Sequence, residues 1–492
     1  MKRKNRSNKT VNRAGGEAYA QTPELRLASM LLTSFAQDQF YRSQKDTFDE
    51  LVALIAQCDP QFVAKAGIYA RTQYGMRSIT HVLAAELAPY LSGKSWAKNY
   101  YERTVFRPDD MTETVAYYLA KGGKTLPNAM KKGFAKAFDK FDGYQLAKYR
   151  GEKNAVKLID IVNLVHPTPT QRNAKALTQL VNGDLRSQNT WESKLTQAGK
   201  KATSKAEKAD LKHKAWADLI QSGRIGYFAL LRNLRNIVEQ APNQLDAALS
   251  ILTDKRRITN PRNLVMPFRY LVAYKQFGVN APEISGHNAN SRKIRQALAK
   301  AVEIACENVP NLENTLVVID NSGSMTSPAS GSLHLMCSEA GAIFGMLLAK
   351  QSNADLMEFG TSARYIDYDL NDDIMKFGEG FSYKNQVGHG TDFKSIFRKA
   401  NRQYDRIVIF SDMQGWIGQY SPQTAYQDYR NRTGANPFVY MFDLGGYGST
   451  QLNNNDSKVF QIAGFNEKVF EIMSLLETDR QALVKAINNV EL

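Results

Sequence analysis

Apolar side chains recur at three- and four-residue spacing through residues 24–310. Segments such as SITHVLAAELAPYL (78–91) and FRYLVAYKQF (268–277) place them on one face of a helix. Short breaks, among them Cys58–Pro60 and Pro167–Pro169, separate one such segment from the next. No fixed repeat length is visible, but stacking antiparallel helix pairs is the natural way to bury stripes of this kind. We therefore expect residues 24–310 to form an all-α helical-repeat domain.

The pattern changes at about residue 311, where short apolar runs rich in Val, Ile and Phe alternate with amphipathic stretches. Such alternation predicts strands and helices that build a mainly parallel, doubly wound α/β sheet. In sheets of this kind a ligand lies beyond the carboxyl ends of the strands. The runs assigned to strands are TLVVID (315–320), ADLMEFGT (354–361), RIVIFSD (406–412), NPFVYMFDL (436–444) and KVFQIAGF (458–465). Residues 311–492 are therefore assigned to a second, α/β domain.

Charge divides the chain at nearly the same place. The net charge is +16; residues 1–300 hold 49 Lys and Arg against 25 Asp and Glu, a net of +24, whereas residues 301–492 hold 15 against 23, a net of −8. A positive excess confined to one region attracts polyanions in a salt-dependent way. The basic N-terminus, MKRKNRSNKTVNR, favours a flexible, solvated tail over residues 1–23, with a nuclear address or a nucleic-acid arm as the alternative.

Cysteine usage and hydropathy bear on the compartment. Cys58, Cys306 and Cys337 lie far apart and form no zinc-type pair, which favours a reducing compartment. No stretch approaches the roughly 20 uncharged apolar residues of a membrane helix. The N-terminal charges are not followed by the apolar segment of a secretory signal. We expect a cytoplasmic monomer that has no membrane contact.

Oxygen-bearing side chains gather where three loops of the α/β domain should meet. Asp320-Asn-Ser322-Gly-Ser324 follows the first strand, Ser411-Asp412 ends a later one, and Thr391 lies in a loop between them. These loops supply carboxylate and hydroxyl oxygens without sulfur or imidazole. Hard oxygen ligands favour Mg²⁺, with Mn²⁺ or Ca²⁺ as alternatives. An ordinary α/β domain in which these residues only cap helices is the competing interpretation.

The D-x-S-x-S motif with its two companion loops resembles the metal-ion-dependent adhesion site of von Willebrand factor A (vWA) domains. The resemblance implies that Ser322, Ser324 and Thr391 are hydroxyl ligands. It also implies that Asp320 and Asp412 hold the ion directly or through water, and that one coordination position stays open for an acidic group of a partner. The loops offer no additional His or Glu pair that could activate a water molecule, so we expect no enzymatic activity. His389 should pack beside the site or support it from outside.

Cationic side chains cluster in the helical region. Lys132, Lys136 and Lys140 recur every four residues and would form one cationic ridge on a helix. Lys and Arg contact phosphates, and a neighbouring Tyr or His can stack on an unpaired base. A solvated helix face is the alternative for any one cluster. Further clusters are Lys148-Tyr149-Arg150, Arg232 with Arg235, Lys255–Arg257 and Arg292–Arg295.

Four stretches resemble the TROVE module of the Ro autoantigen family and its bacterial relatives. They are NRAGGEAY (12–19), the run from FAKAFDKF to HPTP (134–169), FALLRNL (228–234) and MPFRYLVAYK (266–275). The family also ends in a vWA domain, so the resemblance spans nearly the whole chain. It implies HEAT-like helical repeats closed into a ring that binds single-stranded 3′ ends of misfolded RNAs in its hole. It further implies Y-type small RNA on the outer basic surface and an exoribonuclease partner.

The resemblance also suggests individual RNA-contacting residues. Lys148, Arg150 and His166 lie in the segment similar to the one whose basic residues and histidine contact Y RNA. His166 could equally be a helix-end histidine, and Arg232 of FALLRNL could be structural. We expect an RNA-binding scaffold or chaperone in RNA quality control, without DNA binding. The alternatives are a metal-dependent protein-interaction module of adhesion type and, less favoured, a metal-dependent nuclease.

Overall fold

The computed structural model describes residues 8–492 except 34–42, 187–194, 198, 201–202, 224, 261–264, 266, 279–286, 306–308, 329–334, 418–420 and 463–467. The chain forms two compact units. The unit that we call the helical unit comprises Phe48–Leu219 and Val484–Leu492. The unit that we call the sheet unit comprises Met1–Thr47 and Ile220–Leu483. Each unit therefore includes a segment from the opposite end of the chain.

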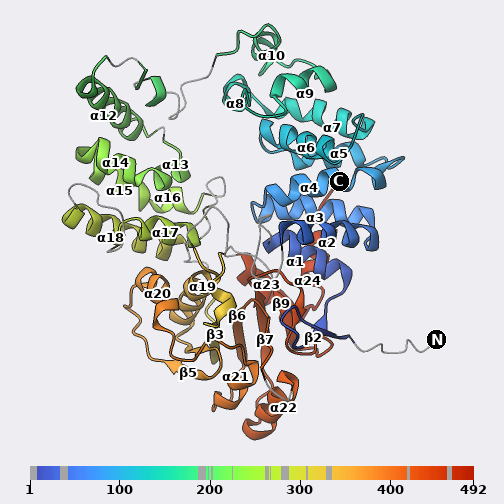
Figure 1. Cartoon of the computed structure of the whole chain (residues 1–492), viewed down its shortest axis with the longest axis vertical. Coiled ribbons are helices and arrows are strands. Elements are labelled where there is room, and N and C mark those ends of the chain that lie inside the picture. The colour runs from blue at the N-terminus through green and yellow to red at the C-terminus, as the bar shows by residue number, and fades with distance from the viewer. Residues whose placement is uncertain are drawn as a thin grey trace. The chain divides into compact units, whose positions relative to one another are not determined.

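The helical unit is a series of short helices, most of which pack on near neighbours in the sequence (Figure 1). Helix α3 shows how one begins: Asp59 accepts hydrogen bonds from the backbone N–H groups of Gln61 and Phe62, and Pro60 occupies the first turn. The helices are α2 (Gln44–Gln57), α3 (Pro60–Gln73), α4 (Ser78–Glu86), α5 (Ala97–Thr104), α6 (Pro108–Ala120), α7 (Asn128–Ala137), α8 (Gly143–Lys148), α9 (Leu158–Val165), α10 (Ala174–Val181) and α12 (Lys205–Gln221), with 3-10 turns η1 (Ala88–Leu91) and η2 (Phe138–Lys140).

A buried carboxylate ties three of these helices together. Asp110, in the first turn of α6, is 1% exposed. It accepts hydrogen bonds from Arg71 of α3 at 3.1 Å, from Arg77 at 3.2 Å and from His81 of α4 at 3.0 Å. Burial would raise the pKa of Asp110, but the hydrogen bond from His81 and the charge of Arg71 outweigh it and hold that pKa well below its usual range.

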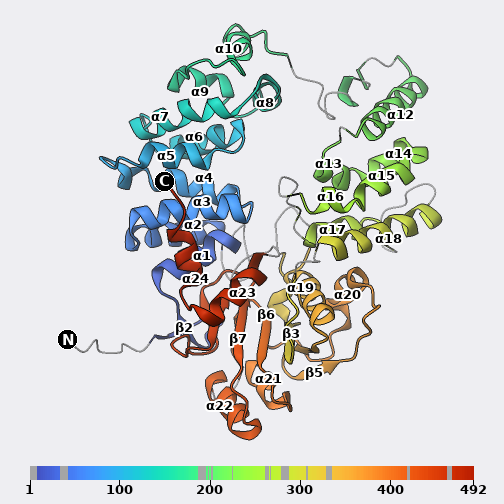
Figure 2. The same ribbon diagram turned by 180° about the vertical axis from the view of Figure 1, so that it is seen from behind.

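The C-terminal residues complete the helical unit. The Lys65 ammonium of α3 donates to the carbonyl oxygen of Asn488 at 2.5 Å. The Arg103 guanidinium of α5 reaches the Glu491 carboxylate at 3.1 Å. Figures 1 and 2 show helix α24 (Ala482–Asn488) beside α2 and α3 from both sides.

The sheet unit combines further helices with the α/β domain. Helix α17 contacts α19 and α20, and the Lys275 ammonium donates to the Glu339 carboxylate at 2.6 Å. The compact units therefore do not follow the domain boundary that we placed at residue 310. The helices that precede the large sheet are α1 (Pro23–Thr33), α13 (Tyr227–Arg232), α14 (Leu234–Gln240), α15 (Leu245–Leu252), α16 (Lys255–Ile258), α17 (Pro267–Lys275) and α18 (His287–Ala305), with 3-10 turn η3 (Pro242–Gln244).

The large sheet has six strands in the order β5-β4-β3-β6-β7-β9. Strand β5 is antiparallel to β4, and the other neighbours are parallel. Its strands are β3 (Thr315–Asp320), β4 (Asp355–Phe359), β5 (Ala363–Ile366), β6 (Arg406–Ser411), β7 (Phe438–Asp443) and β9 (Val459–Ile462). The helices of this domain are α19 (Cys337–Ser352), α20 (Ile374–Gly380), α21 (Phe393–Lys399), α22 (Pro422–Thr433) and α23 (Lys468–Thr478), with 3-10 turns η5 (Gly323–Thr326) and η6 (Ser382–Lys384).

Helices cover both faces of this sheet. Phe393 and Phe397 of α21 and Tyr426 of α22 belong to one buried cluster with alternate residues of the strands. On the other face, Phe344 of α19 stacks on Phe410 of β6, with ring centroids 6.4 Å apart. Burial on both faces explains why the strands read as continuous apolar runs. The predicted fold class, a helical region followed by a doubly wound α/β domain, is confirmed.

Two parts of the sequence prediction need correction. Strand β5 was not anticipated, because ARYI is short and only half-buried. The prediction of a flexible tail over residues 1–23 is wrong from Lys9 onward, since β1 (Lys9–Val11) and β2 (Glu17–Ala20) form a hairpin that pairs with β8 (Ser449–Thr450). Residues 1–7 lie outside the described part. No helix among the described residues has the length and apolar character needed to cross a membrane.

Candidate metal centre and nucleic-acid interface

The predicted metal residues lie at the carboxyl edge of the sheet. Asp320 is the last residue of β3, and Ser411 is the last residue of its parallel neighbour β6. The loops are joined directly: the Gly323 N–H donates to the His389 carbonyl at 2.8 Å. The Trp416 N–H donates to the Thr391 carbonyl at 3.1 Å. The three loops therefore converge, as the sequence analysis expected.

Two carboxylates form the centre of this edge, and both are buried. Asp320 Oδ1 accepts from the Ser322 N–H at 2.8 Å, and its Oδ2 accepts from the Ser411 hydroxyl at 2.5 Å. Burial raises the pKa of Asp320 above its usual range, although these hydrogen bonds partly offset the effect. Burial together with the charge of Asp320 raises the pKa of Asp412 further. Two neighbouring buried carboxyls resist ionising together unless a cation neutralises them.

Asp412 leaves one oxygen free to face such a cation. Its Oδ1 accepts from the Gln414 N–H at 3.1 Å, whereas its Oδ2 is buried and has no hydrogen-bond partner among the described residues. An unpaired buried carboxylate oxygen is costly and calls for a ligand. The hydroxyl groups of Ser322 and Ser324 lie 3.4 Å apart, and both side chains are buried. This donor set suits Mg²⁺, so the residues fit the predicted ion.

Thr391 and His389 occupy the third loop. Thr391 is buried, and its carbonyl oxygen holds the loop that follows β6. The backbone carbonyl of His389 accepts from the Gly323 N–H and so ties this loop to the one that follows β3. In the described part of the chain no three His, Cys, Asp or Glu side chains are grouped as metal ligands. A site at this edge therefore depends on hydroxyl oxygens together with its two carboxylates.

A third acidic residue at this edge, Asp443, was not among the predicted site residues. It ends β7 opposite Ser411 and is buried. Its carboxylate accepts from the Gly448 N–H at 2.9 Å and from the Gln461 amide at 3.1 Å. Its position at a strand end was the available signal. These contacts give Asp443 a role in holding the loop after β7.

The loop that carries Asp412 has a constrained backbone. Met413 has φ 61°, which a side chain of this type rarely adopts. The Met413 N–H donates to the Ser411 hydroxyl at 2.9 Å, and the Gln451 amide donates to the Met413 carbonyl at 2.9 Å. Constrained backbone of this kind persists where the surroundings fix it and is frequent at ligand sites.

Comparison with known families agrees with this architecture. Residues 25–214 match the TROVE domain family, and residues 314–476 match the Ro60 vWA domain family. The chain is a TROVE-module protein of the Ro family. A solved structure of the Deinococcus radiodurans RO (RSR) protein superposes with a TM-score of 0.61 at 19% identity, covering 93% of this chain and all of that one. At this identity the likeness supports the fold.

The matches to curated relatives cover only part of each protein. The RNA-binding protein RO60 of Caenorhabditis elegans is 25% identical over 256 residues, which is 50% of this Ro family chain and 39% of the relative. Telomerase protein component 1 of Mus musculus is 22% identical over 344 residues, 52% of this chain and 13% of the relative. Its Rattus norvegicus counterpart is 28% identical over 147 residues, 28% of this chain and 6% of the relative. The chain thus spans well under half the length of these relatives.

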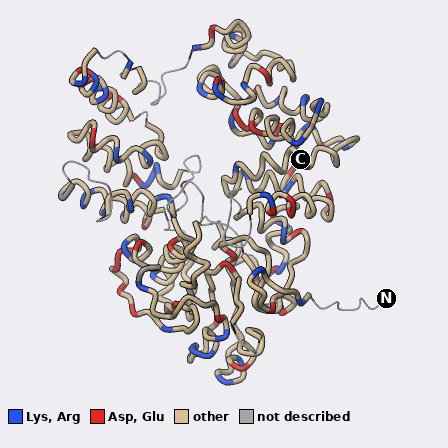
Figure 3. Tube along the Cα trace, viewed as in Figure 1, with Lys and Arg blue, Asp and Glu red and all other residues tan. Residues whose placement is uncertain are grey.

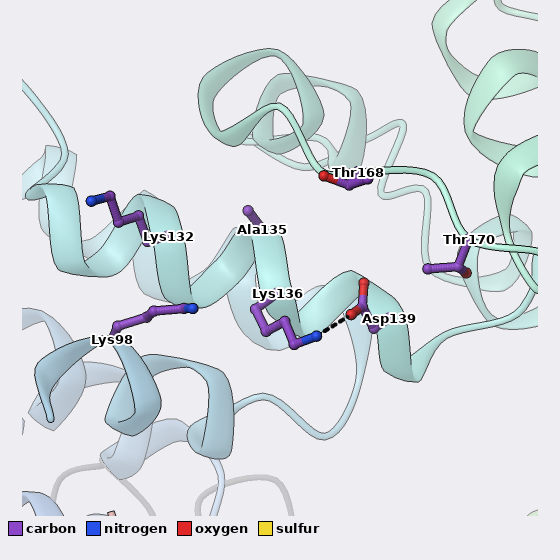
Figure 4. Close-up of a pocket in the computed structure, with 7 residues that line it drawn as sticks. All are labelled: Lys98, Lys132, Ala135, Lys136, Asp139, Thr168 and Thr170. Carbon is purple, nitrogen blue, oxygen red and sulfur yellow. Dashed lines mark hydrogen bonds and ion pairs between the residues drawn. The ribbon is translucent and has the colours of Figure 1, made fainter.

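Two of the predicted RNA-binding lysines of this Ro family protein line a cavity of about 430 Å³ in the helical unit. Lys132 and Lys136 come from α7 and Lys98 from α5, while Thr168 and Thr170 lie on the segment after α9 (Figure 4). Lys136 pairs with Asp139 at 2.7 Å. The Thr170 hydroxyl has no hydrogen-bond partner among the described residues. The remaining lining residues are Ala135 and Asp139.

The expected ridge does not extend to Lys140. Helix α7 ends at Ala137, and Lys140 lies in η2, where it turns toward the end of α5. Its ammonium donates to the Glu102 carbonyl at 2.5 Å, and burial lowers its pKa. A cation at the carbonyl end of a helix is stabilised by the helix dipole. Lys140 therefore caps a helix, and the prediction that it belongs to a cationic ridge is wrong.

The stretch from Lys148 to His166 contains two exposed and one half-buried candidate. The Lys148 ammonium is exposed and lies 5.5 Å from the Tyr149 ring. Arg150 is half-buried, donates to the Leu185 carbonyl and pairs with Glu152 at 3.0 Å. His166 caps α9 in the left-handed conformation with φ 47°, and its side chain is exposed. His166 is thus a helix-end residue whose ring is accessible.

Arg232 belongs to a second cationic feature, in the sheet unit. Arg232 ends α13, and Arg269 lies on α17; each guanidinium carbon is 5.7 Å from the centre of the Phe228 ring. Burial and the charge of Arg232 lower the pKa of Arg269. No acidic partner of either arginine occurs among the described residues. Phe228 is 37% exposed, so the group presents a partly accessible aromatic ring beside two cations. Figure 3 marks the basic residues along these helices.

Proposed function

We propose that this Ro family protein binds RNA through the cationic side chains of its TROVE and neighbouring helices. The observation that carries the proposal is the pair Arg232 and Arg269, which flank Phe228 without a described acidic partner. Guanidinium groups beside an exposed aromatic ring suit a nucleotide, because the ring stacks on the base while the cations bind phosphate. The name of the Caenorhabditis elegans relative, an RNA-binding protein, supports the same conclusion.

The finer proposal concerns which RNA is bound. We infer single-stranded 3′ ends of misfolded noncoding RNAs and a structured, Y-type small RNA, with the protein acting as a scaffold for an exoribonuclease rather than as the nuclease. The cavity lined by Lys98 and Lys132 offers a cationic site for phosphate groups of the structured RNA. For both kinds of RNA we expect contacts with phosphate groups to supply most of the binding free energy, so the affinity should fall steeply as the salt concentration rises.

A titration of fluorescently labelled RNA tests this function. A stem with a single-stranded 3′ extension should bind more tightly than the same stem with blunt ends, and affinity should decrease linearly with salt on logarithmic axes. Lack of binding at low salt would eliminate the proposal. Degradation of the labelled RNA by the purified protein with Mg²⁺ would replace the scaffold with a nuclease.

A metal-dependent protein-interaction module is the second candidate, favoured by the unpaired Oδ2 of Asp412. We infer that Asp320, Ser322, Ser324, Thr391 and Asp412 hold Mg²⁺ and leave a position open for an acidic group. If interaction were the main function, Asp320→Ala should abolish partner capture and leave RNA affinity unchanged. An equal loss of RNA affinity in this variant would join the metal site to RNA binding.

A further inference from the structure

The NRAGGEAY segment lies against the candidate metal site, although about 400 residues separate the two along the chain. Strand β2 pairs antiparallel with β1 on one side and with β8 on the other. The pairs between β2 and β8 are Tyr19–Thr450 and Ala20–Ser449. The hairpin is therefore part of the sheet unit. Its turn, from Asn12 to Gly16, reaches the loop that follows β6.

The turn is built around the side chain of Asn12. Asn12 Oδ1 accepts from the N–H groups of Ala14 at 3.0 Å and Gly16 at 2.8 Å. Its amide nitrogen then donates outward, to the Gly415 carbonyl at 2.6 Å. Gly15 has φ 87°, which favours glycine. With 6% of its surface exposed, Asn12 is a buried polar residue that both shapes the turn and bonds the loop.

The fit between the two segments leaves no room for a side chain at Gly16. A Cβ added to Gly16 would lie 2.0 Å from the Gly415 carbonyl oxygen. Beside this contact, the Arg13 N–H donates to the Gln414 side-chain oxygen at 2.8 Å. Both successive residues of the loop, Gln414 and Gly415, are thus held by the N-terminal turn.

These contacts continue to the ligand residue Asp412. The Gln414 N–H donates to Asp412 Oδ1 at 3.1 Å, and the Gln414 amide donates to the Asp412 carbonyl at 3.2 Å. Gln414 is fully buried, so its position fixes the orientation of the Asp412 carboxylate. Met413, between them, has the left-handed backbone that needs such support. The Oδ2 atom of Asp412 takes no part in this chain of hydrogen bonds.

We propose that Asn12 and Gly16 are positioning residues of the metal site, which hold the Gln414–Gly415 loop so that Asp412 presents its free carboxylate oxygen to the ion. This proposal rests on the proposed metal site. Loss of the turn lets the loop relax from the Met413 conformation, and the ligand must then be reordered when the ion binds. Affinity for the ion therefore falls without removal of any ligand.

Titration with Mn²⁺, followed by electron paramagnetic resonance of the free ion, tests the proposal on the full chain. Asn12→Ala should raise the dissociation constant about five- to thirty-fold, the effect expected for losing one buried hydrogen bond. Asn12→Asp keeps the acceptor of the turn but loses the donor to Gly415, and should weaken binding as well. Glu17→Gln, an exposed change on the same hairpin, should leave the dissociation constant unchanged.

Hydrogen exchange without metal supplies an independent readout. In EDTA, the peptide that spans residues 412–417 should exchange faster in Asn12→Ala than in the wild type, while peptides from the helical unit stay unchanged. Equal Mn²⁺ affinity and equal exchange in the wild type and both Asn12 variants would overturn the positioning role. Wild-type protein that binds no Mn²⁺ would instead overturn the metal site, and the positioning role with it. Should Asn12→Ala fail to fold, Asn12→Asp and Gly16→Ala give the same comparison.

Discussion

Replacing Asp412 by Asn should stabilise the metal-free protein and remove its response to Mg²⁺. In the absence of metal, Asp412 and Asp320 are buried together, and burial with mutual repulsion raises the pKa of Asp412. A carboxyl whose pKa is raised by folding costs stability as the pH rises above its unfolded value of about 4. The neutral amide keeps the shape of the side chain and removes this cost.

Removal of the Asp412 charge and binding of Mg²⁺ both raise the free energy of unfolding, by comparable amounts. An uncompensated buried charge costs about 3 kcal/mol, so Asp412→Asn should raise the stability of the sheet unit in EDTA at pH 8 by an amount of this order. Mg²⁺ at a hundredfold excess over its dissociation constant should stabilise the wild type by about 2.7 kcal/mol. For a unit of roughly 300 residues either change corresponds to about 4–5 °C in the thermal midpoint.

Differential scanning fluorimetry in EDTA and in Mg²⁺ measures both. Wild type should melt higher with Mg²⁺, whereas Asp412→Asn should melt at one temperature in both buffers, above metal-free wild type. Asp443→Asn is the matched control, because its carboxylate is already held by Gly448 and Gln461 and its loss should lower the midpoint in both buffers. A variant that melts below metal-free wild type, or that keeps the Mg²⁺ response, would refute the reasoning.

Three further predictions concern the helices. Arg232→Ala should weaken single-stranded RNA binding about five- to tenfold and lower the salt slope by about one in an anisotropy titration, whereas Arg235→Ala, which removes an arginine paired with Glu239, should have little effect. Lys140→Ala should lower the thermal midpoint and leave RNA affinity unchanged, the reverse of what an RNA ridge would give. Asp110→Asn should lower the free energy of unfolding by about 3 kcal/mol at pH 7, measured by urea denaturation. Because folding lowers the pKa of Asp110, the wild type loses this stability as the pH falls below about 4, and the difference between the two proteins should shrink there.

Periodicity was sufficient to predict the architecture because burial imposes it directly. The strands that lie between helical layers, such as TLVVID, are apolar on both faces and stand out as runs. The position of the candidate metal site could be predicted because parallel strands end at the same edge of a sheet. This rule places Asp320 and Asp412 close together. Strand β5 was not predicted, because a half-buried edge strand does not appear in the sequence as a continuous apolar run.

Side-chain direction was the part that spacing could not supply. Lys132 and Lys140 differ by two four-residue steps, yet α7 ends between them, and Lys140 faces a helix end instead of solvent. Residues 9–20 were assigned to a flexible tail because of the basic run MKRKNRSNKTVNR at residues 1–13. Their partners, Ser449 and Gly415, lie more than 390 residues away, and contacts at that separation leave no local pattern.

Each unit contains a segment from the opposite end of the chain, which matters when fragments of the protein are expressed. The matched families span residues 25–214 and 314–476, and neither span includes Asn12 or Glu491. Asn12 holds the loop of the sheet unit that carries Asp412, and Glu491 bonds Arg103 of the helical unit. A fragment cut at the family boundaries therefore loses hydrogen-bond partners that the intact chain supplies from its opposite end. Loss of the buried Asn12 bond costs about 1–3 kcal/mol, whereas loss of the exposed Glu491 pair costs at most about 1 kcal/mol. Weak metal binding by an isolated vWA fragment would thus reflect the missing hairpin, and only the full chain tests the site.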